Sequence, residues 1–420
     1  LNLVHFPSCK QDVKEALRYL KYEEFLRFQL TMQYIKLSRN KNIGIKKIFD
    51  QQKLNEFVQN LPFKLTADQI KASHDILHDL QKETVMYRFV QGDVGSGKTV
   101  VGAIGLYANY LSGYQGALMA PTEILATQHF QSLTKLFDKT NIKMALLTGH
   151  LSAGKKQEIY QELESGKIDI VIGTHALFQE KVNYNKLGLV ITDEQHRFGV
   201  KQRKALKDKG KQVDFMIMSA TPIPRTLAIS LYGDMDVSTI KTMPAGRKPV
   251  ITRLVKSLSM KPILKDLLDY LASGGQCYVV CPLVNESEAI SSRDATSIYQ
   301  GMKKYFKDKY QIGLLHGQMD DETKDQVMMQ FKNNEIQILV STTVIEVGVD
   351  VSNANWMVIY NAERFGLSQI HQLRGRIGRG NQQGYCFLLS NSTADEAIER
   401  LEFLTKCNDG FEVSLYDLKM

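Results

Sequence analysis

The stretch Gly92-Asp93-Val94-Gly95-Ser96-Gly97-Lys98-Thr99 decides the fold of this 420-residue chain. It matches the pattern G-x-x-x-x-G-K-[ST], follows a short apolar run and precedes a helix-compatible segment. In such a loop, glycines let the backbone turn so that its N–H groups and the helix N-terminus face phosphate oxygens. We therefore predict a P-loop whose eight residues bind ATP, with Lys98 at the β and γ phosphates and the Thr99 hydroxyl on Mg²⁺.

Short apolar runs alternate with helix-compatible segments on both sides of this loop. In the first half of the chain they cover 88–91, 117–120, 144–147, 168–172, 187–191 and 215–218. In the second half they cover 251–255, 278–281, 312–315, 336–340, 356–360 and 385–389. The pattern is typical of parallel sheets with helices on both faces. We predict an α/β fold with two tandem lobes, over 61–242 and 243–408, joined by a polar hinge at 243–249.

The N-terminal segment has a different pattern. From Asp12 to Lys36, apolar residues recur at helical spacing, and no Gly or Pro interrupts them. We predict that residues 1–60 form a short helical linker ahead of the first lobe.

The composition narrows the class of protein. The 53 Lys and Arg residues exceed the 45 Asp and Glu by eight, which suits a polyanionic partner. A hydrophobic fraction of 43% excludes wholesale disorder. The five scattered cysteines form no disulfide framework, and no apolar run is long enough to span a bilayer. We expect a protein of the reducing cytoplasm with no membrane partner.

A pair of acids follows the apolar run 187–191. In a parallel sheet the carboxyl ends of the strands meet at one edge, where ligands bind. We therefore expect Asp193 to bind Mg²⁺ and Glu194 to act as the base for the attacking water. The guanine-reading pattern Asn-Lys-x-Asp is missing, since Asn185-Lys186-Leu187-Gly188 lacks the acid. This excludes a GTPase.

The second half of the chain contributes arginines. The segment Gln372–Arg379 holds three of them between glycines, and guanidinium groups suit the charge on a transferring phosphoryl group. We predict that Arg376 and Arg379 reach across the cleft to the γ-phosphate. We also place Gly348 and Asp350 at the nucleotide in that cleft, where Gly348 permits close backbone approach.

Taken together, these stretches resemble the ordered motifs of superfamily-two helicases. They lie at 92–99, 120–123, 193–196, 219–221, 342–350 and 372–379. The amino-acid sequences of residues 172–177, 193–200 and 219–226 are similar to those of the RecG family of bacterial branched-DNA helicases. Transcription-repair coupling factors share much of it, but Gln195 favours RecG. The resemblance covers the chain from about residue 10 and implies two RecA-like P-loop NTPase lobes.

The resemblance also implies roles for further residues. The segment Leu61–Gln69 looks like the adenine-reading segment, with Phe63 and Gln69 as nucleotide contacts. The residues implied on the DNA backbone path are Thr122, Thr174, His175 and Thr342. Those implied to couple the ATP site to that path are His196, Ser219 and Thr221.

The implied function is an ATP-dependent DNA helicase or translocase that acts on forks and Holliday junctions in recombination and repair. Its cofactors would be ATP and Mg²⁺, and its partners branched double-stranded DNA and single-stranded-DNA-binding protein. We expect a monomer in the bacterial cytoplasm, at the nucleoid. Three alternatives stay open: a transcription-repair-coupling-type translocase, an RNA helicase, and a nucleotide-dependent nucleic-acid-binding scaffold without turnover.

Two departures from the RecG pattern concern the ends of the chain. RecG proteins carry an N-terminal wedge domain, and residues 1–60 resemble only the linker after it. Residues 409–420 resemble the start of the C-terminal translocation element, cut short. We therefore expect a motor-core fragment.

Overall fold

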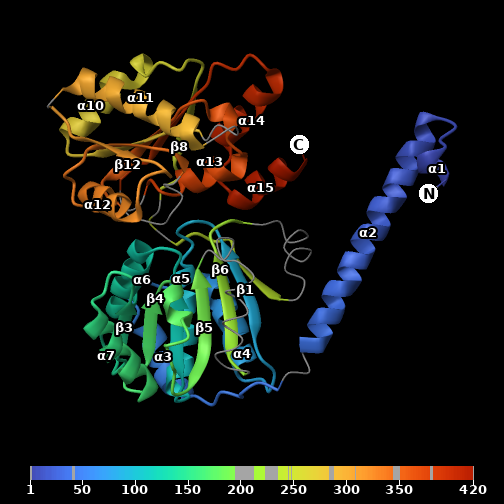
Figure 1. The fold of residues 1–420 in the computed structure, drawn as a ribbon, viewed down its shortest axis with the longest axis vertical. Helices are drawn as coiled ribbons and strands as arrows, with labels where there is room; N and C mark the ends of the chain where they lie inside the picture. The colour runs from blue at the N-terminus through green and yellow to red at the C-terminus, as the bar shows by residue number, and fades with distance from the viewer. Residues whose placement is uncertain are drawn as a thin grey trace.

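A computed structural model shows the two predicted lobes stacked on one another, with a helical rod at one side (Figure 1). The structure describes residues 2–39, 43–193, 212–222, 235–244, 246, 248–282, 288–307, 309–343, 351–378 and 382–419. Each lobe contains one sheet, and all strand pairs within both sheets are parallel. The predicted α/β class with two lobes is confirmed.

Lobe 1 is built on a seven-stranded sheet with the order β3-β4-β2-β5-β6-β1-β7. The strands are β1 (Tyr87–Gly92), β2 (Gln115–Met119), β3 (Met144–Leu147), β4 (Ile170–Gly173), β5 (Leu187–Asp193), β6 (Asp214–Ser219) and β7 (Asp236–Ile240). The helices are α4 (Ala67–Leu80), α5 (Lys98–Leu111), α6 (Glu123–Leu136), α7 (Ala153–Glu164) and the 3₁₀ turn η1 (His175–Phe178). Six strands coincide with the predicted apolar runs. Edge strand β7 was not predicted, because Asp236-Val-Ser-Thr-Ile240 contains only two apolar residues, which are not adjacent.

Lobe 2 has a six-stranded sheet with the order β10-β11-β9-β12-β13-β8. Its strands are β8 (Ile251–Val255), β9 (Gln276–Val280), β10 (Ile312–Leu315), β11 (Ile338–Ser341), β12 (Ala354–Ile359) and β13 (Tyr385–Leu389). Its helices are η3 (Lys261–Ile263), α10 (Leu264–Ala272), α11 (Glu288–Phe306), α12 (Asp321–Lys332), η5 (Ala362–Arg364), α13 (Leu367–Arg374), α14 (Asp395–Lys406) and α15 (Gly410–Lys419). All six strands overlap the predicted runs.

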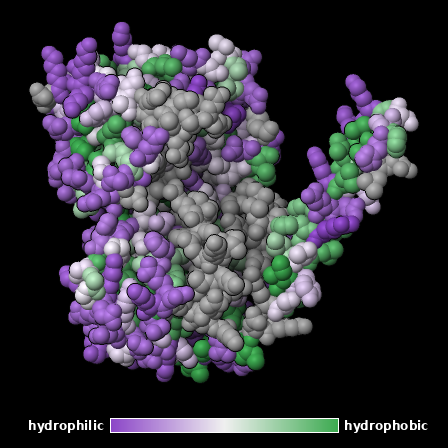
Figure 2. Space-filling model, in the orientation of Figure 1, coloured by the Kyte–Doolittle hydropathy of each residue, from purple (hydrophilic) through white to green (hydrophobic). Residues whose placement is uncertain are grey.

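The rod consists of α1 (Asn2–His5) and the 30-residue helix α2 (Lys10–Arg39). It stands beside the lobes, and apolar patches lie along its surface (Figures 1 and 2). Lys36 near its end forms an ion pair with Asp236 of lobe 1 at 2.9 Å. None of the helices within the described residues has the length and apolar character needed to cross a membrane.

Residues 43–60 pack with lobe 1, although the boundary predicted from the sequence places them in the helical linker 1–60. Leu54 and Phe57 of α3 (Gln51–Gln59) lie in the same core as the helices of lobe 1. The ammonium group of Lys47 is buried and forms an ion pair with Asp214 at the start of β6. Burial of these apolar and charged groups makes this segment part of the lobe.

Candidate nucleotide site between the lobes

The predicted P-loop connects β1 to the N-terminus of α5, in the centre of lobe 1. Gly95 and Gly97 have φ values of +80° and +83°, a region that residues with a Cβ rarely adopt. A Cβ on Gly97 would lie 2.2 Å from the side-chain nitrogen of Gln69. The shape of the loop therefore requires both glycines; the sequence pattern fixes Gly97, while Gly95 stands at one of its variable positions.

The loop offers donors that fit the phosphates of a nucleotide. The Lys98 ammonium group is buried and donates to the carbonyl oxygens of Gly92 and Asp93, each at 2.9 Å. The Ser96 hydroxyl is fully buried and has no hydrogen-bond partner among the described residues. A buried polar group without a partner costs free energy, so a ligand oxygen at this position would be favourable.

The adenine-side residues lie next to the loop. Gln69 belongs to a capping box: its side-chain oxygen accepts from the Thr66 N–H at 2.8 Å. Its side-chain nitrogen donates to the Ser96 carbonyl, also at 2.8 Å. Phe63 exposes 48% of its surface, so its ring is available for stacking. The Gln69 amide thus supports the P-loop, and its contact with a base stays a prediction.

Asp193 lies at the carboxyl end of β5 and receives a hydrogen bond from the side chain of His129 in α6, at 2.8 Å. Burial raises the pKa of Asp193. The hydrogen bond and charge of His129, followed by the charges of Lys98 and Arg376, outweigh this effect, so that the pKa lies below its ordinary value. The carboxylate is therefore ionised at neutral pH, as a metal ligand must be.

The oxygen atoms of Thr99 and Asp193 are the ligand type that Mg²⁺ prefers. No group of three or more His, Cys, Asp or Glu side chains in the described ranges forms a complete metal cage. In nucleotide sites, Mg²⁺ is held by one or two protein groups together with substrate phosphates. The predicted metal ligands therefore suit the ion.

Lobe 2 places its arginine segment directly on the P-loop. Gly375, at the end of α13, packs so closely that a Cβ there would lie 2.6 Å from the Cβ of Val94. Arg376 follows and is buried, and its charge helps to lower the pKa of Asp193 in the other lobe. The predicted arginine from lobe 2 and the acid from lobe 1 therefore belong to one site.

Arg374, the first arginine of the segment, lies within lobe 2. Its guanidinium group donates to the carbonyl oxygens of Leu404 and Cys407, at 2.7 and 3.0 Å. Burial lowers its pKa. This arginine holds the end of α13 to the end of α14.

The predicted DNA-path residues follow strands at the carboxyl edges of both sheets. Thr122 follows β2 and caps α6, accepting from the Leu125 N–H at 3.4 Å. After the neighbouring β4, Thr174 is buried and His175 is exposed. In lobe 2, Thr342 follows β11 and is buried, with a hydroxyl that lacks a partner in the described structure. Contact of these residues with DNA stays a prediction.

Of the predicted coupling residues, Ser219 and Thr221 lie at the end of β6, and their hydroxyl groups are 2.6 Å apart. His196 lies outside the described residues, as do Glu194, Gly348, Asp350 and Arg379. Their assignments stay predictions.

Sequence reasoning missed two residues at this site, His129 and His371. His129 is a single histidine in an amphipathic helix, and no pattern distinguishes it from a surface residue. His371 directly precedes the arginine segment, and its contact with Asp93 of the P-loop joins residues 278 positions apart in the chain. The packing of α6 on the lobe 1 sheet reveals the role of His129, and the approach of the two lobes reveals that of His371.

The fold and the arrangement of the site are those of the two-lobed helicases. Residues 66–229 match the DEAD/DEAH box helicase family, and residues 261–381 match the helicase conserved C-terminal domain. Solved structures of lower identity share this fold, including Mss116p bound to single-stranded RNA and AMP-PNP, with 16% identity and a TM-score of 0.64 over 86% of this chain and 78% of that one.

Within this class, the chain is similar over its whole length to RecG helicases. It is 49% identical over 421 residues to the ATP-dependent DNA helicase RecG of Bacillus subtilis, covering 100% of this chain and 62% of that protein. The RecG of Thermotoga maritima is 48% identical over 99% of this chain and 53% of its own length. A structure of RecG bound to a three-way DNA junction matches with 46% identity and a TM-score of 0.88, over 100% of this chain and 55% of that one. The chain thus spans little more than half the length of these relatives.

Proposed function

We propose that this chain is an ATP-driven motor that moves on double-stranded DNA and remodels forks and junctions. The observation that carries the proposal is the close packing of the lobe 2 arginine segment on the P-loop, where a Cβ on Gly375 would lie 2.6 Å from the Cβ of Val94 and the buried Arg376 follows. Charged groups that are divided between two lobes suit hydrolysis that is linked to lobe movement. The similarity to a RecG that was solved on a three-way DNA junction supports branched DNA as the substrate.

In the proposed reaction, Lys98 exchanges the Gly92 and Asp93 carbonyls for oxygens of the β and γ phosphates. Thr99 and Asp193 would hold Mg²⁺, which neutralises phosphate charge when bound. Glu194 takes a proton from the water that attacks the γ-phosphorus, and the bond to the ADP oxygen breaks. Arg376, with Arg379, stabilises the charge that develops on the transferring group. A place in the bacterial cytoplasm at the nucleoid, with single-stranded-DNA-binding protein as a partner, would fit this activity.

An ATPase assay with forked DNA, linear duplex, RNA and no nucleic acid tests the proposal. We expect Mg²⁺-dependent hydrolysis that DNA stimulates and RNA does not, and we expect Lys98→Ala to abolish it. Stimulation by RNA alone would identify an RNA helicase. Nucleotide binding without turnover, under any of these conditions, would identify a scaffold and overturn the proposal.

A further inference from the structure

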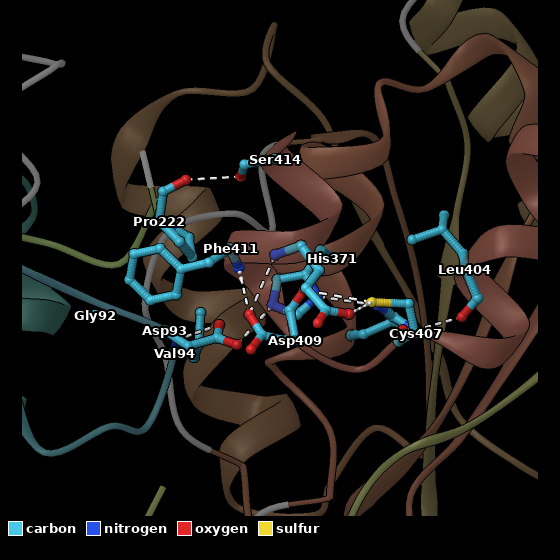
Figure 3. A network of polar contacts seen from close by, with 12 residues as sticks. Gly92, Asp93, Val94, Pro222, His371, Leu404, Cys407, Asp409, Phe411 and Ser414 are labelled. Carbon is cyan, nitrogen blue, oxygen red and sulfur yellow. Dashed lines mark hydrogen bonds and ion pairs between the residues drawn. The ribbon is translucent and has the colours of Figure 1, made fainter. Parts of the chain in front are cut away.

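The carboxylate of Asp93 in the P-loop faces lobe 2. One of its oxygens lies 2.7 Å from Nε2 of His371 in α13, and the other accepts from the Val94 N–H at 2.7 Å (Figure 3). The two side chains expose only 10% and 7% of their surfaces. A carboxylate directed at the phosphates would repel them. The Asp93 side chain therefore has a use other than phosphate contact, while the nucleotide contact predicted for this residue as part of the loop stays a prediction.

The direction of this hydrogen bond follows from the next residue in the network. A guanidinium nitrogen of Arg374 lies 2.9 Å from Nδ1 of His371. Arginine only donates, so Nδ1 is the acceptor, Nε2 carries the ring proton, and Nε2–H donates to Asp93. Burial raises the pKa of Asp93, but the hydrogen bond from His371 and the charge of Lys98 outweigh it and keep the carboxylate ionised. The contact is a buried, charge-assisted hydrogen bond, which is a strong type.

The network continues into the body of lobe 2. Arg374 also donates to the carbonyl oxygens at the end of α14 and to the Thr252 hydroxyl of β8, at 3.2 Å. The His371 ring is thus held from behind by a side chain that is itself fixed. A movement of the P-loop relative to lobe 2 must either break the contact with Asp93 or carry this part of lobe 2 with it.

Close packing lies beside the hydrogen bond. Gly375 has ordinary helical dihedral angles, φ −62° and ψ −15°, so its backbone does not require glycine. Its lack of a side chain is needed because a Cβ would meet Val94 at 2.6 Å. The next residue is Arg376, so the hydrogen bond and this contact together set where that arginine enters the site.

We propose that the Asp93–His371 contact is a lock between the lobes. His371 is a positioning residue: it holds the arginine segment against the P-loop, and Arg376 thereby reaches the phosphate end of the site. The proposal rests on the ATP hydrolysis proposed above, but the lock itself can be measured without hydrolysis.

The test uses the 420-residue chain with spin labels on Glu158→Cys in lobe 1 and Lys265→Cys in lobe 2, in a Cys9→Ser background. Distances between the labels are measured without nucleotide, and kcat and KM for ATP are measured with DNA. For His371→Leu we expect a longer or broader distance distribution. We expect kcat to fall by roughly ten- to a hundredfold, as for loss of a buried charged hydrogen bond, while KM changes little.

Three matched variants separate positioning from loss of structure. His371→Gln keeps an N–H close to the Nε2 position and should restore both the distances and most of kcat. Gly375→Ala keeps all polar groups but clashes with Val94, so it should reproduce the His371→Leu result. The double variant Asp93→Ala/His371→Leu should be no worse than either single variant, because the pair acts as one unit.

Unchanged distances in His371→Leu would overturn the lock, whether or not kcat falls. Additive effects of Asp93→Ala and His371→Leu would also overturn it, since the two residues would then act separately. If the parent chain hydrolyses no ATP, the proposed function fails, while the distances still decide whether the lock exists.

Discussion

At the scale of single residues, the site depends on charges that come from distant parts of the chain. Asp193 is ionised in a buried position because His129 donates to it and because Lys98 and Arg376 lie near it. A buried carboxylate is costly unless it is paired in this way. Removal of any one of these groups should therefore change the properties of the others.

The arginine from lobe 2 gives the first prediction. We expect Arg376→Ala to lower the DNA-stimulated kcat by about 10³–10⁵, the range found for arginine fingers, because charge on the transferring phosphoryl group loses its partner. Binding of a fluorescent ATP analogue should be nearly unchanged. Arg364→Ala, at an exposed position in η5, serves as the control and should behave like the parent. If Arg376→Ala had the same DNA-stimulated kcat as the parent, Arg379 would be the arginine finger instead.

The histidine beside Asp193 gives the second prediction. His129 is 10% exposed and orients one carboxylate oxygen, which leaves the other for a metal ion. In His129→Phe, we expect the Mg²⁺ concentration that half-saturates binding of an ATP analogue to rise by about ten- to a hundredfold. His129→Gln retains a donor and should stay close to the parent. The same Mg²⁺ dependence in all three proteins would show that His129 only fills space.

At the scale of elements, a buried ion pair adds to the apolar packing that fixes the segment ahead of α4 to lobe 1. The Lys47 and Asp214 side chains are 0% and 3% exposed, and Lys47 also donates to the Gly188 carbonyl at 3.1 Å. Asp214 accepts from the Met86 N–H at 2.7 Å. Burial raises the pKa of Asp214 even beside Lys47. The pair links the segment to the starts of three strands, β1, β5 and β6.

Loss of this ion pair gives the third prediction. Lys47→Met leaves a buried carboxylate without its cation, and we expect the free energy of unfolding of lobe 1 to fall by about 3–5 kcal/mol. Urea denaturation followed by circular dichroism reports both lobes, while fluorescence of the single tryptophan, Trp356 in β12, reports lobe 2. The change should appear in the first signal and be absent from the second. Lys53→Met, in an exposed pair with Asp50, should change stability by less than about 1 kcal/mol.

At the scale of the whole molecule, the lobes contact one another at several points besides the Asp93–His371 pair. The Ser414 hydroxyl of α15 donates to the Pro222 carbonyl at 2.7 Å (Figure 3). The Lys241 ammonium lies 5.5 Å from the centre of the Phe411 ring. Ile124, at the start of α6, packs against the core of lobe 2. These contacts hold α15 and the core of lobe 2 against residues that follow β2, β6 and β7 of lobe 1.

The net charge of +8 gives the fourth prediction, for DNA binding by these 420 residues. Sequence-independent contacts with phosphates release counterions, so log K should fall linearly with log salt, by about 0.9 per phosphate neutralised. We expect the affinity for linear duplex to fall at least about tenfold between roughly 50 and 200 mM salt. Fluorescence anisotropy of a labelled duplex measures this. An affinity independent of salt would rule out binding dominated by phosphate contacts.

The sequence by itself determined the fold class, the P-loop and the acid at the end of β5. Such features are local: an apolar run followed by glycines and Lys98-Thr99 predicts a strand and a P-loop, whatever the rest of the chain contains. For the same reason, β7 was not predicted. Its five residues carry no local signal and are ordered by pairing with β1.

Only the tertiary structure decided how the lobes share the site. In the structure, the Asp93 side chain faces lobe 2, and Arg374 lies within that lobe. Arg376 lies near Asp193. His129 and His371 contact the carboxylates of Asp193 and Asp93. These roles depend on which groups meet in space. Hydrogen bonds and charges act over a few ångströms, so residues far apart in the chain acquire them only when the sheets and lobes have come together.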